Sequence, residues 1–309
     1  IAPADGAQRV LGIDVSYAQR ESVNFKKAAK MGSAYCFIRA GSGRTVMDEN
    51  YDHNYKEAGK AGMLRGIYYY LYPEQKATIG TPEERTMEGQ ARRFAAMLKP
   101  DAELGAVLDV EDRALSPDDV RRFVDEFQKY DPYGRLIMIY TGVGYWSKWS
   151  GYTGSAVAWA AKHPLWIAQY MDAKKLVKPS ETHQMAMPEP WESQVFHQWT
   201  CVGGSMVHHV SDSLDLNYFK GSLADLKAWA GGTVKPTVTI PPAFKYVNAP
   251  YGLNLRSKPS TQGTIIKLMS YGEPVEVLED GDWVLLKSGD DTGYASCDYL
   301  SAENPINQA

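Results

Sequence analysis

Residues 105–119 read Gly-Ala-Val-Leu-Asp-Val-Glu-Asp-Arg-Ala-Leu-Ser-Pro-Asp-Asp, and this stretch carries the two signals that decide the fold. Its first six residues form a short apolar run, which is typical of a buried strand. Ser116 then supplies an N-cap and Pro117 suits the first helical position, so the sequence predicts a helix that continues over 120–130. A buried strand followed directly by a helix is the repeating unit of α/β folds.

The same alternation extends in both directions from this stretch. Further apolar runs predict strands at 10–15, 34–39, 66–70, 136–140, 165–168, 195–199 and 213–216. Thr81-Pro82-Glu83-Glu84 predicts a second capped helix that continues over 85–98. Eight strands alternating with helices predict a parallel α/β barrel, and weak helix signals in its last third predict an irregular, TIM-like one.

The stretch 231–243, Gly-Gly-Thr-Val-Lys-Pro-Thr-Val-Thr-Ile-Pro-Pro-Ala, separates two patterns. Its glycines, prolines and β-branched residues predict a semi-rigid spacer. After it, turn signals separate short strands predicted at 253–256, 265–268, 274–278, 283–287 and 293–296, which is typical of a small all-β barrel. We therefore expect a first domain over 1–230, a linker over 231–243 and a second domain over 244–309.

Charge and composition exclude several classes of protein. The net charge is −4, and the residues from Phe244 onward hold five basic and nine acidic side chains. Neither half has the basic footprint of a nucleic-acid-binding protein. No apolar run is long enough to cross a membrane, so no membrane insertion is expected. Three cysteines, Cys36, Cys201 and Cys297, form neither a disulfide framework nor a zinc motif, and no metal or cofactor is implied.

Acidic residues mark the strands of the predicted barrel. In such barrels the chemistry lies where the strands end, and acids occur at the ends of three predicted strands: Asp14 at the first, Asp109 with Glu111 at the fourth and Asp215 at the eighth. Asp109 and Glu111 are two residues apart and would point to the same side, about 6.6 Å apart along the strand. Their proximity opposes joint ionisation, so one should hold its proton to higher pH, as a general acid must.

The alternatives for Asp109 and Glu111 are a solvated Asp-x-Glu in a loop or a pair neutralised by Arg113. The two further acids, Asp14 and Asp215, argue against both, because a cluster of four carboxylates suits glycoside hydrolysis or divalent-metal binding. Nucleophilic catalysis is poorly supported, since no Gly-x-Ser-x-Gly elbow is present. Cys201 has His197 before it and His208-His209 after it, but a packed thiol is the simpler interpretation than a Cys/His peptidase.

Eight fragments occur in the order found in glycoside hydrolase family 25, the Chalaropsis-type lysozymes common among phage endolysins and bacterial autolysins. The chain resembles that family from about Val10 to Trp229, and eight fragments in order are specific where one would be weak. The fragments are Gly12-Ile-Asp-Val-Ser-Tyr-Ala-Gln19, Phe37-Ile-Arg-Ala40, Gly66-Ile-Tyr-Tyr-Tyr70, Leu108-Asp-Val-Glu111, Ile139-Tyr-Thr141, Leu165-Trp-Ile-Ala-Gln-Tyr170, His197-Gln-Trp-Thr200 and Leu214-Asp-Leu-Asn217.

The resemblance implies an irregular α/β barrel with N-acetylmuramidase activity, which cleaves the β-1,4 bond between N-acetylmuramic acid and N-acetylglucosamine. It implies Glu111 as general acid/base and Asp109 as the group that orients and polarises the substrate's 2-acetamido group. Asp14 and Asp215 match the other acids of the active-site floor. Arg39 stands where the family often has lysine. The expected substrate-binding residues are Arg39, Tyr68, Tyr70, Tyr140, Trp166, Gln169, Tyr170 and Trp199.

Two questions about the reaction stay open at this stage. Participation of the acetamido oxygen with retained configuration is favoured, and a covalent nucleophile, Asp14 or Asp109, is the alternative. Substrate-assisted chitinases also use Asp-x-Glu, but Gly105 and Val107 stand where their longer signature has aspartates. A non-catalytic peptidoglycan-binding protein, a wall peptidase and an N-acetylglucosaminidase on the same scaffold are the other functions to be weighed.

The residues after the spacer resemble a bacterial SH3 domain over about 245–300, through Gly252-Leu-Asn-Leu-Arg-Ser-Lys-Pro-Ser260, Gly272-Glu-Pro-Val275, Trp283, Gly293-Tyr-Ala295 and Tyr299-Leu300. Such modules commonly bind peptidoglycan, often its peptide part. Trp283 and Leu255 fit the core of a small barrel equally well. The candidate wall contacts are Tyr251, Asn254, Arg256, Trp283 and Tyr294. The expected location is extracellular or at the cell wall, after secretion or release through a phage holin.

Overall fold

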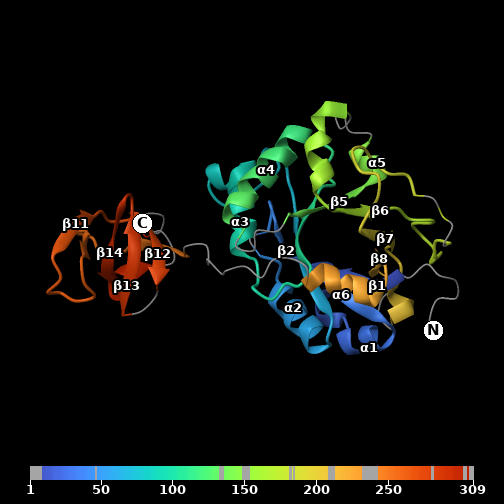
Figure 1. The fold of residues 1–309 in the computed structure, drawn as a ribbon, viewed down its shortest axis with the longest axis horizontal. Helices are drawn as coiled ribbons and strands as arrows, with labels where there is room; N and C mark the ends of the chain where they lie inside the picture. The colour runs from blue at the N-terminus through green and yellow to red at the C-terminus, as the bar shows by residue number, and fades with distance from the viewer. Residues whose placement is uncertain are drawn as a thin grey trace. The chain divides into compact units, whose positions relative to one another are not determined.

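The computed structural model describes residues 9–45, 47–131, 136–147, 154–180, 183, 185–207, 213–231, 243–279, 282–301 and 305. The chain divides into two units, Ile1–Pro236 and Thr237–Ala309, which are described separately below (Figure 1). Residues 232–242 of the predicted spacer lie outside the described residues. Its two ends belong to regular structure, since Gly231 ends helix α6 and Ala243 begins strand β9.

The first unit is built on a closed barrel in which eight strands pair in chain order. Strands β1 to β7 are parallel to their neighbours, whereas β8 is antiparallel to both β7 and β1. The predicted irregular α/β barrel is confirmed, and the expectation of an all-parallel sheet is wrong at its last strand. The strands are β1 (Arg9–Val15), β2 (Ser33–Ser42), β3 (Leu64–Tyr70), β4 (Gly105–Asp109), β5 (Met138–Gly142), β6 (Leu165–Ala168), β7 (Phe196–Thr200) and β8 (Asp215–Lys220).

Helices cover the outside of the barrel most fully over its first half (Figure 1). The α-helices are α1 (Phe25–Lys30), α2 (Tyr51–Lys60), α3 (Met87–Ala96), α4 (Pro117–Tyr130), α5 (Val143–Trp146) and α6 (Leu223–Gly231). Among the described residues between β5 and β8, helical structure is short, which agrees with the weak helix signals there. The 3₁₀ helices of this unit are η1 (Tyr17–Ser22), η2 (Glu83–Arg85), η3 (Gly154–Ala156), η4 (Ala158–Lys162) and η5 (Gly204–Val207).

The two capped helices predicted from the sequence differ in outcome. Ser116 caps α4 as expected, and its hydroxyl accepts the Asp119 N–H at 3.2 Å in a capping box. Thr81 instead accepts the N–H of Glu84 at 3.3 Å, next to the short η2, whose N-cap is Pro82. Helix α3 begins at Met87, where the Thr86 hydroxyl accepts the N–H of Gly89 at 3.0 Å. The predicted continuous helix over 85–98 is therefore wrong at its start, since a second threonine cap lies inside it.

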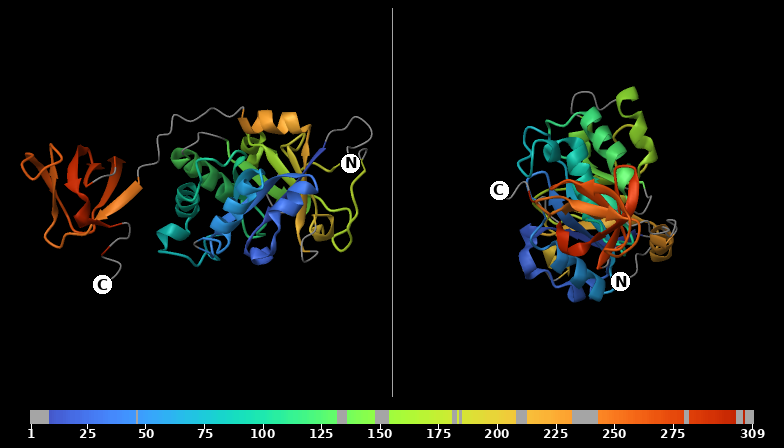
Figure 2. Two further views of the ribbon diagram at one scale, coloured as in Figure 1. Left: turned by 90° about the horizontal axis from the view of Figure 1, so that it is seen from below. Right: turned by 90° about the vertical axis from the view of Figure 1, so that its left-hand side faces the viewer.

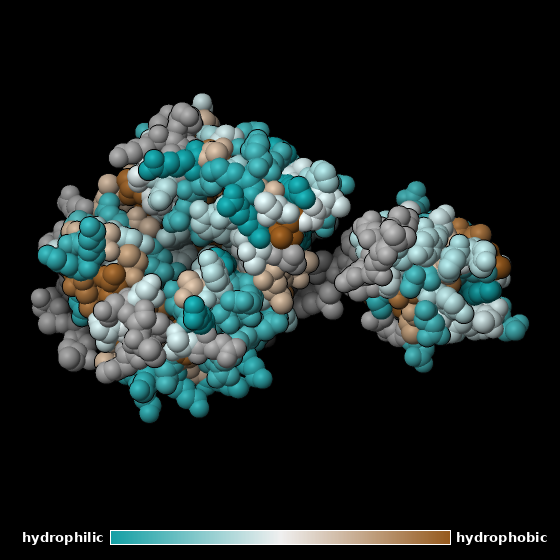
Figure 3. Space-filling model, turned by 180° about the vertical axis from the view of Figure 1, so that it is seen from behind, coloured by the Kyte–Doolittle hydropathy of each residue, from teal (hydrophilic) through white to brown (hydrophobic). Residues whose placement is uncertain are grey.

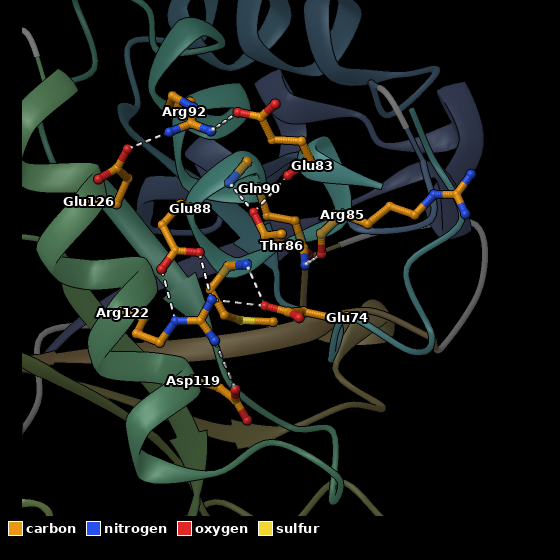
Figure 4. A network of polar contacts seen from close by, with 12 residues as sticks. Glu74, Glu83, Arg85, Thr86, Glu88, Gln90, Arg92, Asp119, Arg122 and Glu126 are labelled. Carbon is orange, nitrogen blue, oxygen red and sulfur yellow. Dashed lines mark hydrogen bonds and ion pairs between the residues drawn. The ribbon is translucent and has the colours of Figure 1, made fainter. Parts of the chain in front are cut away.

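A network of ion pairs ties α3 to α4 and to the loop after β3 (Figure 4). The Arg122 guanidinium on α4 lies 2.7 Å from Glu88 on α3 and 3.0 Å from Glu74 in the loop. Arg92 on α3 lies 2.6 Å from Glu126 on α4. Each partly exposed pair contributes little to stability alone. Together they fix the helices that follow β3 and β4, two strands that carry residues of the site described below.

Aromatic side chains fill the interior of the barrel. Phe37 on β2 stacks on Trp166 on β6 with ring centroids 4.4 Å apart, and it meets Phe196 on β7 edge to face at 5.0 Å. Strand β2 does not pair with β6 or β7, so these contacts cross the interior. Two glycines make room for the rings, because a Cβ at Gly12 would lie 2.3 Å from the ring of Tyr35 and one at Gly66 would lie 2.3 Å from that of Phe37.

Helix α6 closes the interior at the amino-terminal end of the barrel (Figure 2). Its buried Leu226 and Ala230 belong to the same apolar cluster as Val10, Phe37 and Phe196. Trp229 adds an edge-to-face contact with Phe196 at 5.5 Å. The interior is therefore a packed core at this end, as in other barrels of this kind.

The second unit is all β, as predicted, and forms a seven-stranded sheet in the order β11-β10-β14-β13-β12-β9-β15. Its core contains Leu255, Val284 and Leu286, each fully buried. Apolar side chains also reach its surface, among them Ile265 and Leu268 on the edge strand β11 (Figure 3). The strands are β9 (Ala243–Val247), β10 (Leu253–Arg256), β11 (Ile265–Met269), β12 (Pro274–Glu279), β13 (Trp283–Ser288), β14 (Asp291–Ser296) and β15 (Leu300–Ser301), with η6 (Cys297–Tyr299).

Candidate active site

A cavity of about 250 Å³ opens at the carboxyl-terminal end of the barrel. Successive strand residues point to opposite faces, so every second residue of a barrel strand points inward. The last inward positions of the strands meet in this cavity. It is lined by Asp14, Arg39, Tyr68, Tyr70, Asp109, Glu111, Tyr140, Trp166, Tyr170, Gln198 and Asp215.

All four predicted acids line this cavity, although Asp215 arrives by a different route from the one expected. Asp14 lies near the end of β1, whereas Asp215 is the first residue of β8. Because β8 runs antiparallel to β1, its beginning lies at the carboxyl-terminal end of the barrel, and Asp14 pairs directly with Asp215. The reversal of β8 thus adds a fourth carboxylate to this end of the barrel. If β8 were parallel to β1, its last residue, Lys220, would lie here instead.

Asp109 and Glu111 enter the cavity from β4, which does not pair with β1 or β8. Asp109 is the last residue of β4 and Glu111 follows two residues later. Burial is the main cause that raises the pKa of both carboxyl groups, and for Asp109 the negative charges of Glu111 and Asp14 add to it. The Tyr140 hydroxyl beside Glu111 and the Arg39 guanidinium near Asp109 oppose these shifts.

One oxygen of the Asp109 and Glu111 pair lacks a hydrogen-bond partner in the described part of the chain. Oδ1 of Asp109 is buried and has no hydrogen-bond partner among the described residues. An unsatisfied buried oxygen costs about 1–3 kcal/mol, so it is rare unless something binds there. A substrate N–H or O–H group would satisfy it.

Asp14 is held by two amides on the last two strands. Asn217 Nδ2 and Gln198 Nε2 donate to Asp14 Oδ2 at 2.7 and 3.0 Å. Burial raises the pKa of Asp14 to about 6 despite these hydrogen bonds, which lower it. Gln198 Oε1 in turn accepts the hydroxyl protons of Tyr140 at 2.7 Å and Tyr170 at 2.5 Å. Gln198 therefore fixes one acid and two tyrosines of the cavity at once.

Arg39 carries the positive charge nearest these acids, and its contact is fixed by a residue outside the predicted set. Its Nε donates to Asp48 Oδ2 at 2.8 Å, and Asp48 is fully buried. The guanidinium lies over the ring of Tyr17, 4.4 Å from the ring centroid. An arginine in place of the family's lysine thus keeps a planar cation at the rim of the cavity.

The predicted substrate-binding residues separate into two groups. Arg39, Tyr68, Tyr70, Tyr140, Trp166 and Tyr170 line the cavity. Trp199 does not, because it follows the inward-pointing Gln198 and so points outward, where it stacks on Tyr218 at 5.2 Å in the core between barrel and helices. Gln169 precedes Tyr170, and its backbone carbonyl accepts the Nε2–H of His197 at 2.8 Å. The structure does not bring Gln169 or Trp199 to the cavity.

Two residues with a part in the site were missed in the sequence. Gln198 lies within the fragment His197-Gln-Trp-Thr200 and Asn217 ends the fragment Leu214-Asp-Leu-Asn217, but neither residue was predicted to belong to the site. Asn217 accepts the Trp166 Nε1–H at 2.8 Å while it donates to Asp14. The period of two would have found both, since Gln198 and Asn217 pair across β7 and β8 on the inward face.

The candidate wall contacts in the second unit also separate. Asn254, Arg256 and Trp283 line a cavity of about 310 Å³ together with Tyr299. Tyr251 is 96% exposed, whereas Leu255 is fully buried and belongs to the core. Arg256 Nη1 donates to the carbonyls of Thr261 and Gly263 at 3.0 and 2.9 Å, so it also shapes the loop after β10.

Tyr294, the fifth candidate wall contact, is half-buried and does not line this cavity. It lies on β14, where it pairs with Arg256 on one side and with Leu285 on the other.

The other catalytic constellations weighed in the sequence gain nothing from the structure. His197 gives its Nε2–H to a backbone carbonyl, burial lowers its pKa to about 4, and Cys201 contacts the Ala173 carbonyl instead. His208 and His209 lie outside the described residues. In the described part of the chain no group of three His, Cys, Asp or Glu side chains is arranged to hold a metal ion. There, too, no helix is long and apolar enough to cross a membrane.

Comparison with known proteins decides the family. The model of glycosyl hydrolases family 25 matches residues 13–205, which include Asp14, Asp109 and Glu111. The chain belongs to this family. The model of the bacterial SH3 domain matches residues 252–301. Lysozyme M1 of Streptomyces globisporus is 31% identical over 246 residues, which cover 75% of each chain.

Solved structures of the family agree with this assignment. The bacterial lysozyme from Streptomyces coelicolor has a TM-score of 0.57 and 26% identity, and covers 74% of this chain and 100% of its own. The muramidase from Trichobolus zukalii has a TM-score of 0.56 and 27% identity, with 72% of this chain and 100% of its own covered. This family 25 member is a glycoside hydrolase of the N-acetylmuramidase class, a lysozyme with peptidoglycan as its substrate, followed by a bacterial SH3 domain.

Proposed function

We propose that this family 25 enzyme cleaves the β-1,4 bond between N-acetylmuramic acid and N-acetylglucosamine, with Glu111 as general acid and then general base. The observation that carries the proposal is that the buried Asp109 and the half-buried Glu111 line one cavity together with two further acids. Burial raises the pKa of Glu111, so its carboxyl group keeps its proton to higher pH than an exposed glutamate does and can give it to the glycosidic oxygen.

Asp109 has the geometry to act on the substrate's acetamido group. Its unpartnered Oδ1 can accept the acetamido N–H, which orients the acetamido oxygen toward the anomeric carbon. Attack by that oxygen displaces the leaving sugar as Glu111 protonates it. Water, deprotonated by Glu111, then opens the cyclic intermediate, and the configuration is retained. Burial and the neighbouring acids raise the pKa of Asp109, and the positive charge of Arg39 opposes that shift. Arg39 therefore favours the carboxylate form needed for this contact.

The remaining acids support this step rather than carry it. Asp14 receives two amide hydrogen bonds and Asp215 pairs beside it, so both lie on the floor of the cavity. Negative charge at that position would stabilise the positive charge that develops at the anomeric carbon. A covalent sugar adduct on Asp14 or Asp109, trapped with a slow substrate and found by mass spectrometry, would replace this mechanism with a double displacement.

The experiment that tests the activity is an end-group analysis. Purified peptidoglycan is digested, reduced with borohydride and hydrolysed, and the reduced sugars are identified by mass spectrometry. Reduced muramic acid supports the proposal, and NMR of the first-formed anomer tests retention. Reduced glucosamine would mean an N-acetylglucosaminidase, and folded protein that releases no reducing ends from several wall types would mean a binding protein.

For the second unit we propose a wall-binding role directed at the peptide part of peptidoglycan, with the glycan strand bound at the barrel. The division into a catalytic domain over 1–230, a linker over 231–243 and a binding domain over 244–309 follows from this proposal, as does action outside the cell after secretion or holin-dependent release. Support comes from the cavity that Asn254, Trp283 and Tyr299 line on the SH3 unit.

Binding by the second unit is tested with the full chain carrying Glu111→Gln, so that the wall is not digested during the assay. Trp283→Ala should weaken sedimentation with sacculi about tenfold, because a half-buried aromatic anchor is lost from a cavity. Leu278→Ala is the matched control, since Leu278 is 48% exposed and does not line the cavity. Equal binding by both variants would remove the proposed wall contact.

A further inference from the structure

A second cavity, of about 600 Å³, adjoins the catalytic cavity and shares Arg39 and Tyr70 with it. We call it the adjoining cavity. It lies between the segment after β2, which provides Arg44 and Glu49, and the segment after β3, which provides Tyr72. A polymer held at Glu111 and Asp109 therefore has a continuous surface on which a branch can lie.

Arg39, Arg44 and Glu49 are the charged residues that line this cavity, and Arg39 is paired with Asp48. The opposite charges of Arg44 and Glu49 do not neutralise each other. Arg44 Nε donates to the Lys76 carbonyl at 2.9 Å, and the guanidinium lies over the Tyr72 ring, 4.5 Å from its centroid. No carboxylate contacts Arg44 in the described part of the chain, and Glu49 has no ion pair or hydrogen bond there. Both side chains are exposed. The free edge of the guanidinium and the carboxylate are thus open to a ligand.

The backbone that presents Arg44 is fixed before any ligand binds. The Ser42 hydroxyl accepts the Arg44 N–H at 3.1 Å, and the Ser42 N–H donates to the Thr45 carbonyl at 3.0 Å. On the other side, Tyr72 packs on Tyr70 with ring centroids 4.8 Å apart. A preorganised arginine loses less entropy when it binds a carboxylate.

The pairing of charges points to the chemistry of the ligand. A neutral sugar needs neither an open guanidinium nor an open carboxylate, whereas a short peptide with a carboxylate and an amino group matches both. Muramic acid carries such a peptide on its lactyl ether. We propose that the adjoining cavity binds the peptide stem of the muramic acid held in the catalytic cavity, with Arg44 on a stem carboxylate and Glu49 on a stem amino group. This inference rests on the proposed function.

The test compares one glycan with and without its stems. Soluble glycan strands are prepared from peptidoglycan, and half are stripped of peptide by an N-acetylmuramoyl-L-alanine amidase. For the full chain with Arg44→Gln, KM on the stem-bearing strands should rise about fivefold, as expected when a contact between exposed charges is lost, with kcat little changed. On the stripped strands KM should stay within about twofold of the unmodified enzyme's.

Arg85→Gln is the matched control, because the Arg85 Nε also donates to a backbone carbonyl, that of Gly80 at 3.0 Å, and Arg85 does not line the cavity. Acetylation of the stem amino groups should abolish any effect of Glu49→Gln and leave that of Arg44→Gln. An equal rise in KM on both substrates would overturn the proposal and make Arg44 a sugar contact. No change on either would overturn it too. An unmodified enzyme that cuts neither substrate would reject the proposed function itself.

Discussion

The two ends of the barrel interior differ although the same strands build both. On β7, the inward-pointing Phe196 belongs to the aromatic core, and two residues later Gln198 binds Asp14 and two tyrosines. On β4, Val107 is followed in the same way by Asp109. One step of about 6.6 Å along a strand therefore separates a close-packed core from a cluster of carboxylates.

The difference between the two ends explains how the fold remains stable although its active site contains acids that destabilise it. The four acids, two buried and two half-buried, lose hydration, and most of them also lie near another negative charge, so the pKa of each is raised. Their end of the barrel therefore costs stability at neutral pH. The aromatic end packs without polar compromise and is closed by α6. The free energy gained from packing at the aromatic end offsets the electrostatic cost at the acidic end. Such a trade-off between stability and activity is expected of active sites.

The largest effect is expected from a substitution at the polar end that removes activity and leaves stability unchanged. Glu111→Gln should lower kcat/KM for wall lysis by about a thousandfold, because the general acid is lost while the shape is kept. The melting temperature should stay the same or rise, since one buried acid disappears. Turbidity clearance of cell walls measures the first quantity and circular dichroism the second. Lysis at the unmodified rate would remove Glu111 from its proposed role.

The opposite change, at the aromatic end, should remove stability and spare the chemistry. Phe196→Ala leaves a cavity among Tyr35, Phe37 and Trp229 and should lower the free energy of unfolding by about 4 kcal/mol in urea titrations. The surviving folded fraction should keep its KM. Ile266→Ala on the surface of the SH3 unit is the control and should cost less than about 0.5 kcal/mol. Similar losses for both variants would contradict the packed interior.

A substitution of Gln198 tests whether the polar end of the barrel begins at this residue. Gln198→Met keeps the volume but leaves Asp14 and the hydroxyls of Tyr140 and Tyr170 without this partner, so kcat should fall about thirtyfold. Gln90→Met is the matched control, a fully buried glutamine on α3 that binds the carbonyls of Tyr72 and Arg85. It should cost similar stability and leave kcat nearly unchanged. Parallel kcat losses would mean that the effect is structural.

The smallest effect concerns the pH dependence of stability. The pKa of Asp14 is raised to about 6 in the folded chain, so the folded state holds this proton more tightly than the unfolded chain does. Asp14 therefore disfavours folding increasingly as pH rises from its ordinary pKa of 3.8 to about 6, fully above that range and not at all below it. Asp14→Asn should gain roughly 1–2 kcal/mol at pH 8 and nothing at pH 3, measured by denaturant titration at both values. A gain equal at both pH values would assign the effect to packing.

Much of the molecule could be predicted because the signals are local. Short apolar runs located all eight barrel strands, and the capping box at Ser116 located α4. The predicted start of α3 was wrong because two threonines five residues apart, Thr81 and Thr86, each accept a backbone N–H. The helix begins after Thr86, the second of them. Trp199 was expected to line the cavity because it belongs to a fragment that resembles the family, but a fragment does not show which of its side chains point inward. Alternation along β7 points Gln198 inward and Trp199 outward, against Tyr218.

By itself the sequence determined which side chains could meet: period-two alternation places Asp14, Asp109 and Gln198 on the inward face of their strands, since that periodicity is a property of the chain. Only the tertiary structure decided that β8 reverses its direction and brings Asp215 beside Asp14. It also decided that Arg39 is held by Asp48 and that Oδ1 of Asp109 is buried without a partner. Strand direction, burial and pairing depend on contacts between residues far apart in the chain, and no local pattern encodes them.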